Sequence, residues 1–184
     1  MSKTDTDSDC VLDAAVALLG TDPTVADTDG DSQNDLADAD LVFMANPTDL
    51  TGAAAPFAIK EALVENNYDF AAKKDATDHL ELLVANTGSA PLTAFSIYYA
   101  ITDSDSGKVE GTFRKLDGLS LPAGCEARIH LDDGAMAGHF RFNPNPIYTA
   151  SQAAKTFSVM LKTDGFALVS VDIAKDKSGA EAAD

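Results

Sequence analysis

The chain has no tryptophan, two cysteines and thirteen basic residues among its 184. Thirty aspartates and glutamates outweigh those basic residues and give a formal net charge of −17 at pH 7. Such a chain repels nucleic acid and anionic membrane surfaces but attracts divalent cations, so we expect no nucleic-acid partner. No apolar run reaches the roughly 18 residues that a spanning helix needs, and we therefore expect no membrane insertion.

The two cysteines, Cys10 and Cys125, fall in different predicted modules. A disulfide between them would pin the two modules together in an oxidising compartment. We favour the interpretation that they are two unrelated thiols, because pairing cannot be deduced from spacing. Neither a Cys-x-x-Cys pair nor a Cys/His spacing is present, which argues against a zinc site.

Catalytic motifs are also missing, since the sequence contains no G-x-S-x-G nucleophile, phosphate loop or dinucleotide fingerprint. His130 lies two residues before Asp132 and could be oriented as a base, but a histidine on a strand surface is the interpretation that we favour. Asp132 and Asp133 could act as an acid and a base or hold a small cation, yet an acidic turn explains them as well. We therefore expect a protein that is not an enzyme.

What the sequence has in abundance is a repeated acidic pattern near its start. Four aspartates occupy loop positions 1, 3, 5 and 9 in two copies that begin 22 residues apart. This is the spacing of a calcium loop, in which alternate side chains converge on one hard cation that takes six to eight oxygen ligands. The first copy supplies Asp5, Asp7, Asp9 and Asp13, and the second supplies Asp27, Asp29, Asp31 and Asp35.

The two copies differ in the ligand that closes the loop. In the second copy, position 7 offers the carbonyl of Gln33 and position 12 the carboxylate of Asp38, so this copy is complete. In the first copy position 12 is Val16, and this loop could bind weakly, borrow an oxygen or stay empty. Position 6, usually glycine, is Ser32 or Cys10, and a left-handed backbone there costs a non-glycine residue about 1 kcal/mol or more. We therefore predict one tight calcium site, in the second copy.

Residues 20–35, GTDPTVADTDGDSQND, resemble thrombospondin type 3 repeats, and the loop within them also resembles the calcium loop of dockerins. The resemblance covers about the first fifty residues. It implies that aspartates bind calcium in a metal-stiffened spacer of a secreted or surface protein. The position-6 glycines of that family are missing here. The matching ligands are Asp27, Asp29, Asp31, Asp35 and Asp38, followed by Asp5, Asp7, Asp9 and Asp13 of the first copy.

Helical patterns are confined to this N-terminal arm, residues 1–50. We expect one helix over residues 12–19, ended by Gly20, and a second over residues 36–44, each following an acidic loop. The small residues 51–56, TGAAAP, predict a linker.

After the linker the charge thins, and apolar residues alternate with polar ones at a period of two. In residues 95–101 the apolar face carries Phe95 and Tyr99, whereas Tyr98 lies on the opposite face. Short runs of this kind, separated by Gly, Pro, Asn and Asp turns, are typical of an antiparallel β-sandwich. We expect strands over residues 79–85, 95–101, 109–113, 127–131, 157–161 and 169–173, and favour a further strand over a helix in residues 56–70.

Residues 83–92, LVANTGSAPL, place an N-T-G-x-x-P-L turn between two of these strands, and residues 121–124, LPAG, precede another strand. These turns, with the strand sequences FSIYY at residues 95–99 and RIHL at residues 128–131, resemble the cell-adhesion-related immunoglobulin-like domain of bacteria and archaea. The resemblance covers most of residues 78–174 and implies a fold and an extracellular setting. It carries no active-site residues, and a fold by itself does not define a function.

The longest irregular stretch is residues 132–151, which contains Phe140, Arg141, Phe142 and Tyr148. Aromatic rings beside arginine and asparagine are what a sugar or peptide site uses. The alternative, which we favour, is a loop folded back so that its aromatic rings plug the edge of the sandwich.

These features predict a mostly β protein: an immunoglobulin-like antiparallel β-sandwich preceded by a short helical arm with acidic EF-hand-like calcium loops. The expected function is a calcium-binding structural or adhesion module, extracellular or at the cell surface, whose signal peptide has been removed. A carbohydrate- or peptide-binding accessory of a secreted enzyme and a subunit of a surface filament are the alternatives, so surface proteins or polysaccharide are expected partners beside calcium. The expected divisions are calcium repeats in residues 1–50, a linker in 51–56, the sandwich in 57–176 and a flexible tail in 177–184.

Overall fold

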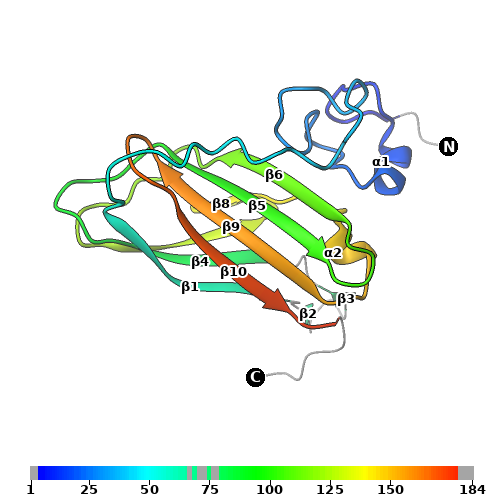
Figure 1. Ribbon diagram of the computed structural model, residues 1–184. Helices are drawn as coiled ribbons and strands as arrows, with labels where there is room; N and C mark the ends of the chain where they lie inside the picture. The colour runs from blue at the N-terminus through cyan, green and yellow to red at the C-terminus, as the bar shows by residue number, and fades with distance from the viewer. Residues whose placement is uncertain (1–3, 66–67, 70–73, 76–78, 178–184) are drawn as a thin grey trace.

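The computed structural model of the chain describes residues 4–65, 68–69, 74–75 and 79–177. Two four-stranded sheets face each other, and an acidic arm, residues 4–50, lies against the second sheet beside β6 (Figure 1). The first sheet has the order β1 (Phe57–Glu65), β4 (His79–Asn86), β7 (Glu126–Asp132) and β8 (His139–Arg141). The second has the order β10 (Val169–Lys175), β9 (Lys155–Thr163), β5 (Phe95–Asp103) and β6 (Val109–Lys115).

Neighbouring strands in both sheets pair in the antiparallel sense, except β7 and β8, which run parallel. Two short strands, β2 (Tyr68–Asp69) and β3 (Lys74–Asp75), form a separate ribbon. The helices are α1 (Asp13–Leu19) in the arm and α2 (Ile147–Ala150) before β9. The chain is therefore mostly β and sandwich-like, as the sequence predicts.

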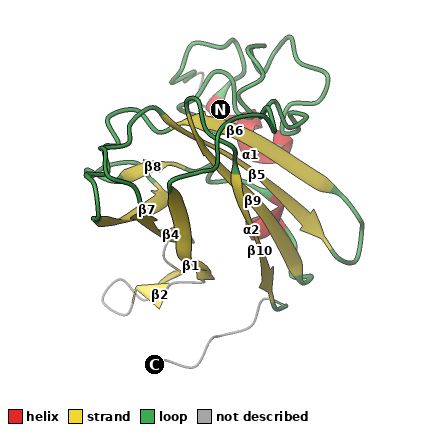
Figure 2. Cartoon of the chain, turned by 60° about the vertical axis from the view of Figure 1, so that its left-hand side comes forward, coloured by secondary structure: helices red, strands yellow, loops and turns green. Residues whose placement is uncertain are grey.

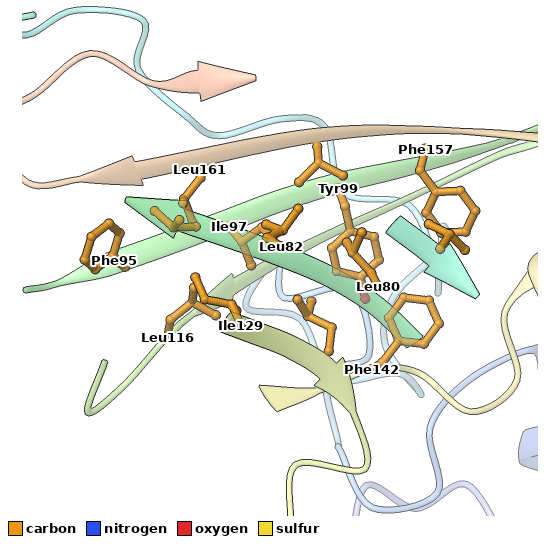
Figure 3. Close-up of a cluster of buried hydrophobic side chains, with 14 of the residues drawn as sticks. Leu80, Leu82, Phe95, Ile97, Tyr99, Leu116, Ile129, Phe142, Phe157 and Leu161 are labelled. Atoms are coloured by element: carbon orange, nitrogen blue, oxygen red, sulfur yellow. The ribbon is translucent and has the colours of Figure 1, made fainter. Parts of the chain in front are cut away.

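The core lies between the two sheets and is built from the alternating apolar residues that the sequence pattern indicates (Figure 3). On β5, Phe95, Ile97, Tyr99 and Ile101 are each at most 2% exposed. Burial of such side chains contributes about 1.5–3 kcal/mol each relative to exposure, which makes this face the main source of stability. The six strands expected beyond residue 78 are confirmed within a few residues at each end, and β1 confirms the strand favoured in residues 56–70, of which 66–67 and 70 lie outside the described residues.

One predicted helix is present and the other is wrong. Helix α1 ends, as expected, where Gly20 adopts a left-handed φ of 83°. Residues 36–44 form turns instead, because short polar side chains compete for the backbone. Asn34 accepts a hydrogen bond from the backbone N–H of Leu36 (2.9 Å), and Asp38 accepts one from that of Asp40 (2.8 Å).

The irregular stretch 132–151 contains two elements that the sequence pattern did not reveal, β8 and α2. The interpretation of the stretch as a plug is confirmed for Phe142 and Tyr148, which are both 4% exposed. Phe142 stacks on Tyr99 of β5 with ring centroids 5.3 Å apart, and Tyr148 meets Phe157 of β9 edge to face at 5.3 Å. Figure 3 shows Phe142 turned into the core beside Tyr99 and Leu80.

The outer face of the second sheet is partly covered by the arm (Figure 2). Tyr98, on the face opposite the core, is only 5% exposed because its hydroxyl donates to the carbonyl of Met44 at 3.0 Å. Further along, Ala53 forms a bridge with Phe166. The segment expected as a linker, residues 51–56, is thus hydrogen-bonded to the loop before β10 at this point.

Three remaining expectations concern the cysteines, the tail and the membrane. Cys10 and Cys125 are free and exposed, which confirms two unrelated thiols. All but the first residue of the tail, 177–184, lies outside the described residues. Within the described part of the chain, no helix is long and apolar enough to cross a bilayer.

Candidate metal centre

The two acidic loops share one backbone conformation. Loop positions 4 and 6 have a left-handed φ in both copies, 64° and 76° at Ser8 and Cys10 and 87° and 78° at Gly30 and Ser32. Three of these four residues are not glycine, and each such residue meets a steric cost of about 1 kcal/mol in this conformation. Both loops are therefore tightly curled by the same pattern of left-handed residues, although position 6 is not glycine in either copy.

The aspartate at position 1 binds backbone N–H groups of the loop in both copies. Asp27 at position 1 accepts hydrogen bonds from the backbone N–H groups of Gly30 (2.8 Å) and Ser32 (2.9 Å). Asp5, its counterpart, accepts one from Cys10 at 3.2 Å. In each copy the carboxylate at position 1 thus holds the N–H of position 6, and in the second copy it also holds the N–H of position 4.

Position 9 closes the loop from the other end. Asp35 accepts hydrogen bonds from both the backbone N–H (2.7 Å) and the hydroxyl (2.8 Å) of Thr28. Asp13 accepts the equivalent pair from Thr6, at 2.9 and 2.8 Å. Both position-9 carboxylates thus bind the position-2 threonine in the structure, an arrangement that the spacing of the aspartates alone did not reveal.

Positions 1, 3 and 5 bring three carboxylates together in each loop. One oxygen each from Asp27, Asp29 and Asp31 lie within 4.8 Å of one another, and the same holds for Asp5, Asp7 and Asp9. These are spacings that a single bound cation can bridge, since calcium–oxygen distances are about 2.3–2.6 Å. The structure therefore gathers six of the ten predicted ligand residues into two groups of three.

Asp29 stands out within the second group. It is only 1% exposed, and among the described residues its Oδ2 atom has no hydrogen-bond partner. Burial, joined by the negative charges of Asp31, Asp38 and Asp27, raises the pKa of Asp29 to about 7. A buried carboxylate oxygen without a donor is costly, and a cation is the partner that such an atom accommodates best.

The other predicted ligands of the second loop lie close by but outside the group of three. Asp38 accepts a hydrogen bond from Asp40 and is near enough to raise the pKa of Asp29. The side-chain amide of Gln33 donates to Asp31 at 2.7 Å, and its main chain donates to the same residue. In the first loop, Val16 occupies position 12 and is 3% exposed within α1, so an apolar contact replaces the closing acid there.

The two loops also contact each other. The side-chain amide of Asn34 donates to the backbone carbonyl of Asp9 at 3.2 Å. Burial raises the pKa of Asp35, and the charge of Asp9 adds to that increase. Asn34 was not singled out in the sequence, because its role depends on the approach of a residue 25 positions away.

The second loop is attached to β6 of the sandwich. The backbone carbonyl of Asp29 accepts a hydrogen bond from the N–H of Phe113 at 2.8 Å. Arg114 donates to the carbonyls of Thr28 and Asp27. Gly30 lies so close to the Phe113 carbonyl that a Cβ atom would collide with it. The residue with the unpartnered carboxylate oxygen is thus also an anchor between loop and sheet.

A second attachment involves the stretch 132–151. Arg141 of β8 binds both carboxylate oxygens of Asp22, whose side chain is 0% exposed. Burial opposes ionisation of Asp22, but hydrogen bonds from Arg141 and Thr24 outweigh it and lower the pKa of Asp22. Asn143 and Asn145 add hydrogen bonds to the carbonyls of Gly20 (2.7 Å) and Thr21 (2.8 Å).

His130 of β7 and His139 of β8 lie opposite each other in the first sheet. The rings of His130 and His139 stack with centroids 4.4 Å apart and an interplanar angle of 7°. Nδ1 of His139 lies 2.5 Å from Asp132, and Nδ1 of His130 lies 3.4 Å from Glu81. His130 is therefore on the strand surface, as predicted, with a stacking partner that the sequence did not indicate.

One buried ion pair lies at the start of β9. Lys155 and Asp103 have side chains 1% and 2% exposed, with Nζ and Oδ2 3.0 Å apart. Hydrogen bonds from Ser151, Ser106 and Lys155 hold the pKa of Asp103 far below its usual range. The pair joins the start of β9 to the end of β5, and the hydroxyl of Ser151, which follows α2, donates to the same carboxylate.

Comparison with known proteins does not assign the chain to a family. No family model and no curated protein matches it. Solved structures that resemble it include the Northeast Structural Genomics Consortium target SoR45, with 10% identity, TM-score 0.42, and coverage of 71% of this chain and 94% of the target. The archaeal flagellum of Methanospirillum hungatei strain JF1 has 12% identity, TM-score 0.36 and 69% coverage of each chain. The putative ApaA protein from Bordetella pertussis has 15% identity, TM-score 0.36, and coverage of 67% and 97%. Likenesses this weak carry no argument about function.

Proposed function

We propose that the chain is a calcium-binding structural or adhesion module, with its principal metal site in the second acidic loop. The observation that carries this proposal is the buried Oδ2 atom of Asp29, which has no donor among the described residues and belongs to a group of three converging carboxylates. A bound cation would satisfy that atom and neutralise the repulsion among Asp27, Asp29 and Asp31.

Calcium fits the donor set better than other common metals. The group offers only carboxylate oxygens, with amide, carbonyl and further carboxylate oxygens of Gln33 and Asp38 nearby. Hard oxygen ligands in an irregular loop suit calcium, which accepts six to eight ligands, whereas zinc favours histidine and cysteine. Magnesium demands near-ideal octahedral geometry, which a flexible acidic loop supplies poorly.

The first loop would form a weaker site. It repeats the left-handed backbone and the converging carboxylates of the second loop, but its position 12 is Val16. Fewer charged ligands reduce calcium affinity. Two sites of unequal affinity, the tighter one in the second loop, are therefore part of the proposal.

The metal would act in two ways, by neutralising the carboxylates and by ordering the loop. Without it, clustered carboxylates repel one another and favour opening of the loop. With it, the loop holds Asp29 and Thr28 in place, and their carbonyls hold the arm against Phe113 and Arg114. A ligand at 100 times its dissociation constant stabilises the bound form by about 2.7 kcal/mol, which is enough to order a marginal segment.

The finer fold type and the location are part of the same proposal. We assign the sandwich to the immunoglobulin-like type, supported by the strand orders β1-β4-β7 and β10-β9-β5-β6, which match the A-B-E and G-F-C-C′ orders of that type. β8 departs from it, because this strand follows β7 in the chain and pairs with it in parallel. The resemblances to calcium repeats and to an adhesion domain support an extracellular or cell-surface location.

The alternative of a carbohydrate or peptide site has less support. Two of the aromatic rings in residues 132–151 on which it depended, those of Phe142 and Tyr148, are buried in the core, and Phe140 is partly buried. Nothing specific within the described chain favours a filament subunit over an adhesion module.

Calorimetric titration of the chelated protein with calcium tests the proposal. Asp29→Asn keeps the shape of the side chain and removes the charge, so we expect the tight site to be lost. Asp117→Asn removes the same charge from an exposed turn outside the arm and is the matched control, which should bind as the wild type does. Wild-type protein that binds no calcium at millimolar concentration, or an Asp29→Asn variant with unchanged affinity, would overturn the assignment.

A further inference from the structure

Strand β6 forms an edge of the second sheet, and the arm covers that edge. The N–H of Gly111 donates to the carbonyl of Val42 at 3.0 Å, and the N–H of Met44 donates to the carbonyl of Gly111 at 2.9 Å. Two residues further along, Phe113 donates to Asp29. Edge strands present unpaired main-chain groups that pair readily with another chain, and here the molecule supplies that pairing from its own arm.

The fit between arm and edge is specific. A Cβ atom on Gly111 would lie 2.5 Å from the hydroxyl of Tyr98 and 2.7 Å from the carbonyl of Met44. Tyr98 in turn donates to that same carbonyl. Only a residue without a side chain permits this approach, so the edge is shaped for the segment 42–44 and not for an arbitrary strand.

The connection between arm and sandwich is long enough to open. Residues 45–52 run from Met44 to the bridge at Ala53, and all but one of them are exposed. At about 3.5 Å per extended residue they span up to about 28 Å. Figure 1 shows this connection passing over the second sheet toward β1, so the arm is attached at a distance from the edge that it covers.

We propose that two copies of this chain exchange their arms, so that the arm of each copy docks along β6 of the other. A second copy is the partner that fits this edge, because its arm presents the same Val42, Met44 and Asp29 to β6. The closed monomer and the exchanged dimer then share their contacts and differ mainly at the connection, which is the condition under which domain swapping has a low cost.

Calcium would control the exchange, and this part rests on the proposed function. Asp29 supplies both a carboxylate to the metal group and a carbonyl to Phe113. Withdrawal of the metal would loosen the second loop and release one of the points that hold the arm. Calcium added back at high protein concentration would then fix whichever arm, its own or its neighbour's, occupies the edge.

The test is size-exclusion chromatography with light scattering after chelation and restoration of calcium. Protein near about 1 mM competes with the effective concentration of an arm on a short connection, so we expect dimers there and monomers after the same treatment at micromolar concentration. At equilibrium the ratio of dimer to monomer should rise about tenfold for each tenfold rise in free monomer. A wild-type chain that stays monomeric at millimolar concentration would overturn the proposal.

Two variants separate arm exchange from other association. Gly111→Val blocks the docking position, so this variant should form no dimer, and hydrogen exchange of β5 and β9 would show that its sandwich is folded. Asp22→Asn removes an ion pair that the closed monomer and the exchanged dimer share, without touching β6 or the metal group. It should therefore speed the exchange between the two forms even with calcium present, and leave their ratio at equilibrium unchanged. Dimers of Gly111→Val equal to those of wild type would contradict arm exchange. Exchange that is faster in Asp22→Asn but does not respond to chelation would uphold arm exchange and contradict calcium control.

Discussion

Arg141 of β8 and Asp22 of the acidic arm form a two-point ion pair, with Nε and Nη2 of the arginine 2.5 and 2.7 Å from the two carboxylate oxygens. The residues are 119 positions apart in the chain, yet the carboxylate has no exposed surface. A parallel fork of this kind fixes orientation as well as distance. The stretch 132–151 therefore serves two purposes, since Phe142 fills the core and Arg141 holds the arm.

Asp22→Asn is expected to loosen the arm while leaving the sandwich folded. The variant leaves the Arg141 guanidinium without its carboxylate, and hydrogen bonds to charged groups contribute about 1.5–3 kcal/mol. Hydrogen exchange should accelerate at Thr21, Thr24 and the loop amides but not in β5 or β9. Asp49→Asn, which alters an exposed aspartate of the arm, is the control. Unchanged protection of the arm in Asp22→Asn would show that the ion pair does not hold it.

Phe142→Ala is expected to lower the free energy of unfolding by about 3–5 kcal/mol, because it removes a buried ring that stacks on Tyr99. Met136→Ala, in the same stretch but 64% exposed, should change it by less than about 0.5 kcal/mol. Urea unfolding measures both. Similar stabilities of the two variants would mean that the stretch does not plug the core.

Ser32→Gly is expected to raise calcium affinity. Ser32 has a left-handed φ of 78°, and glycine adopts this conformation without the steric cost of about 1 kcal/mol. Relief of that cost corresponds to a roughly fivefold tighter site if the loop is less strained in its open form. Ser104→Gly, outside the loops, is the control. An affinity for calcium in Ser32→Gly equal to or weaker than that of wild type would contradict the account of strain in the loop.

The stability of the arm in chelated protein should fall as pH rises from about 4 to about 7. Burial and neighbouring carboxylates raise the pKa of Asp29 to about 7, above its ordinary value of 3.8. The folded arm therefore binds the proton more tightly than the open arm, so the favourable contribution of this group is complete at low pH and is lost through this window. The opposite trend is expected from Asp22, whose lowered pKa contributes stability that disappears on acidification below the ordinary carboxyl range.

Hydrogen exchange of the arm as a function of pH, corrected for the intrinsic rate, measures this behaviour. Asp29→Asn should reduce the decline between pH 4 and 7, and the raised pKa of Asp35 accounts for the part that remains. Saturating calcium should suppress the decline, because the metal replaces the proton. A wild-type arm that grows more stable over this range in the presence of chelator would contradict the role of Asp29.

Short-range patterns in the sequence were sufficient for most of the sandwich. Alternation at a period of two reports which face of a strand is buried, so the core positions on β5 could be read directly. The carboxylates of Asp27, Asp29 and Asp31 could also be grouped, because their convergence depends on the local curl of one loop. Neither inference needs knowledge of residues far away in the chain.

Features that depend on distant contacts could not be read in this way. Tyr98 occupies a polar face by pattern but is buried by Met44, which approaches from the arm. Arg141 gave no sign of its partner, since the pairing with Asp22 exists only once β8 and the arm are in place. The turns in residues 36–44 replaced a predicted helix, because Asn34 and Asp38 bind the backbone more favourably than helical hydrogen bonds allow.

A backbone amide NMR titration of the chelated protein with calcium tests the central claim most directly. The account predicts saturable shifts at Gly30, Asp31 and Ser32 with one equivalent of calcium, and a coupled shift at Phe113, whose N–H binds the Asp29 carbonyl. Shifts at Cys10 and its neighbours should follow at higher concentration. Small, unsaturable shifts spread evenly over the acidic surface would contradict a specific calcium site and would indicate that the arm attracts cations only non-specifically.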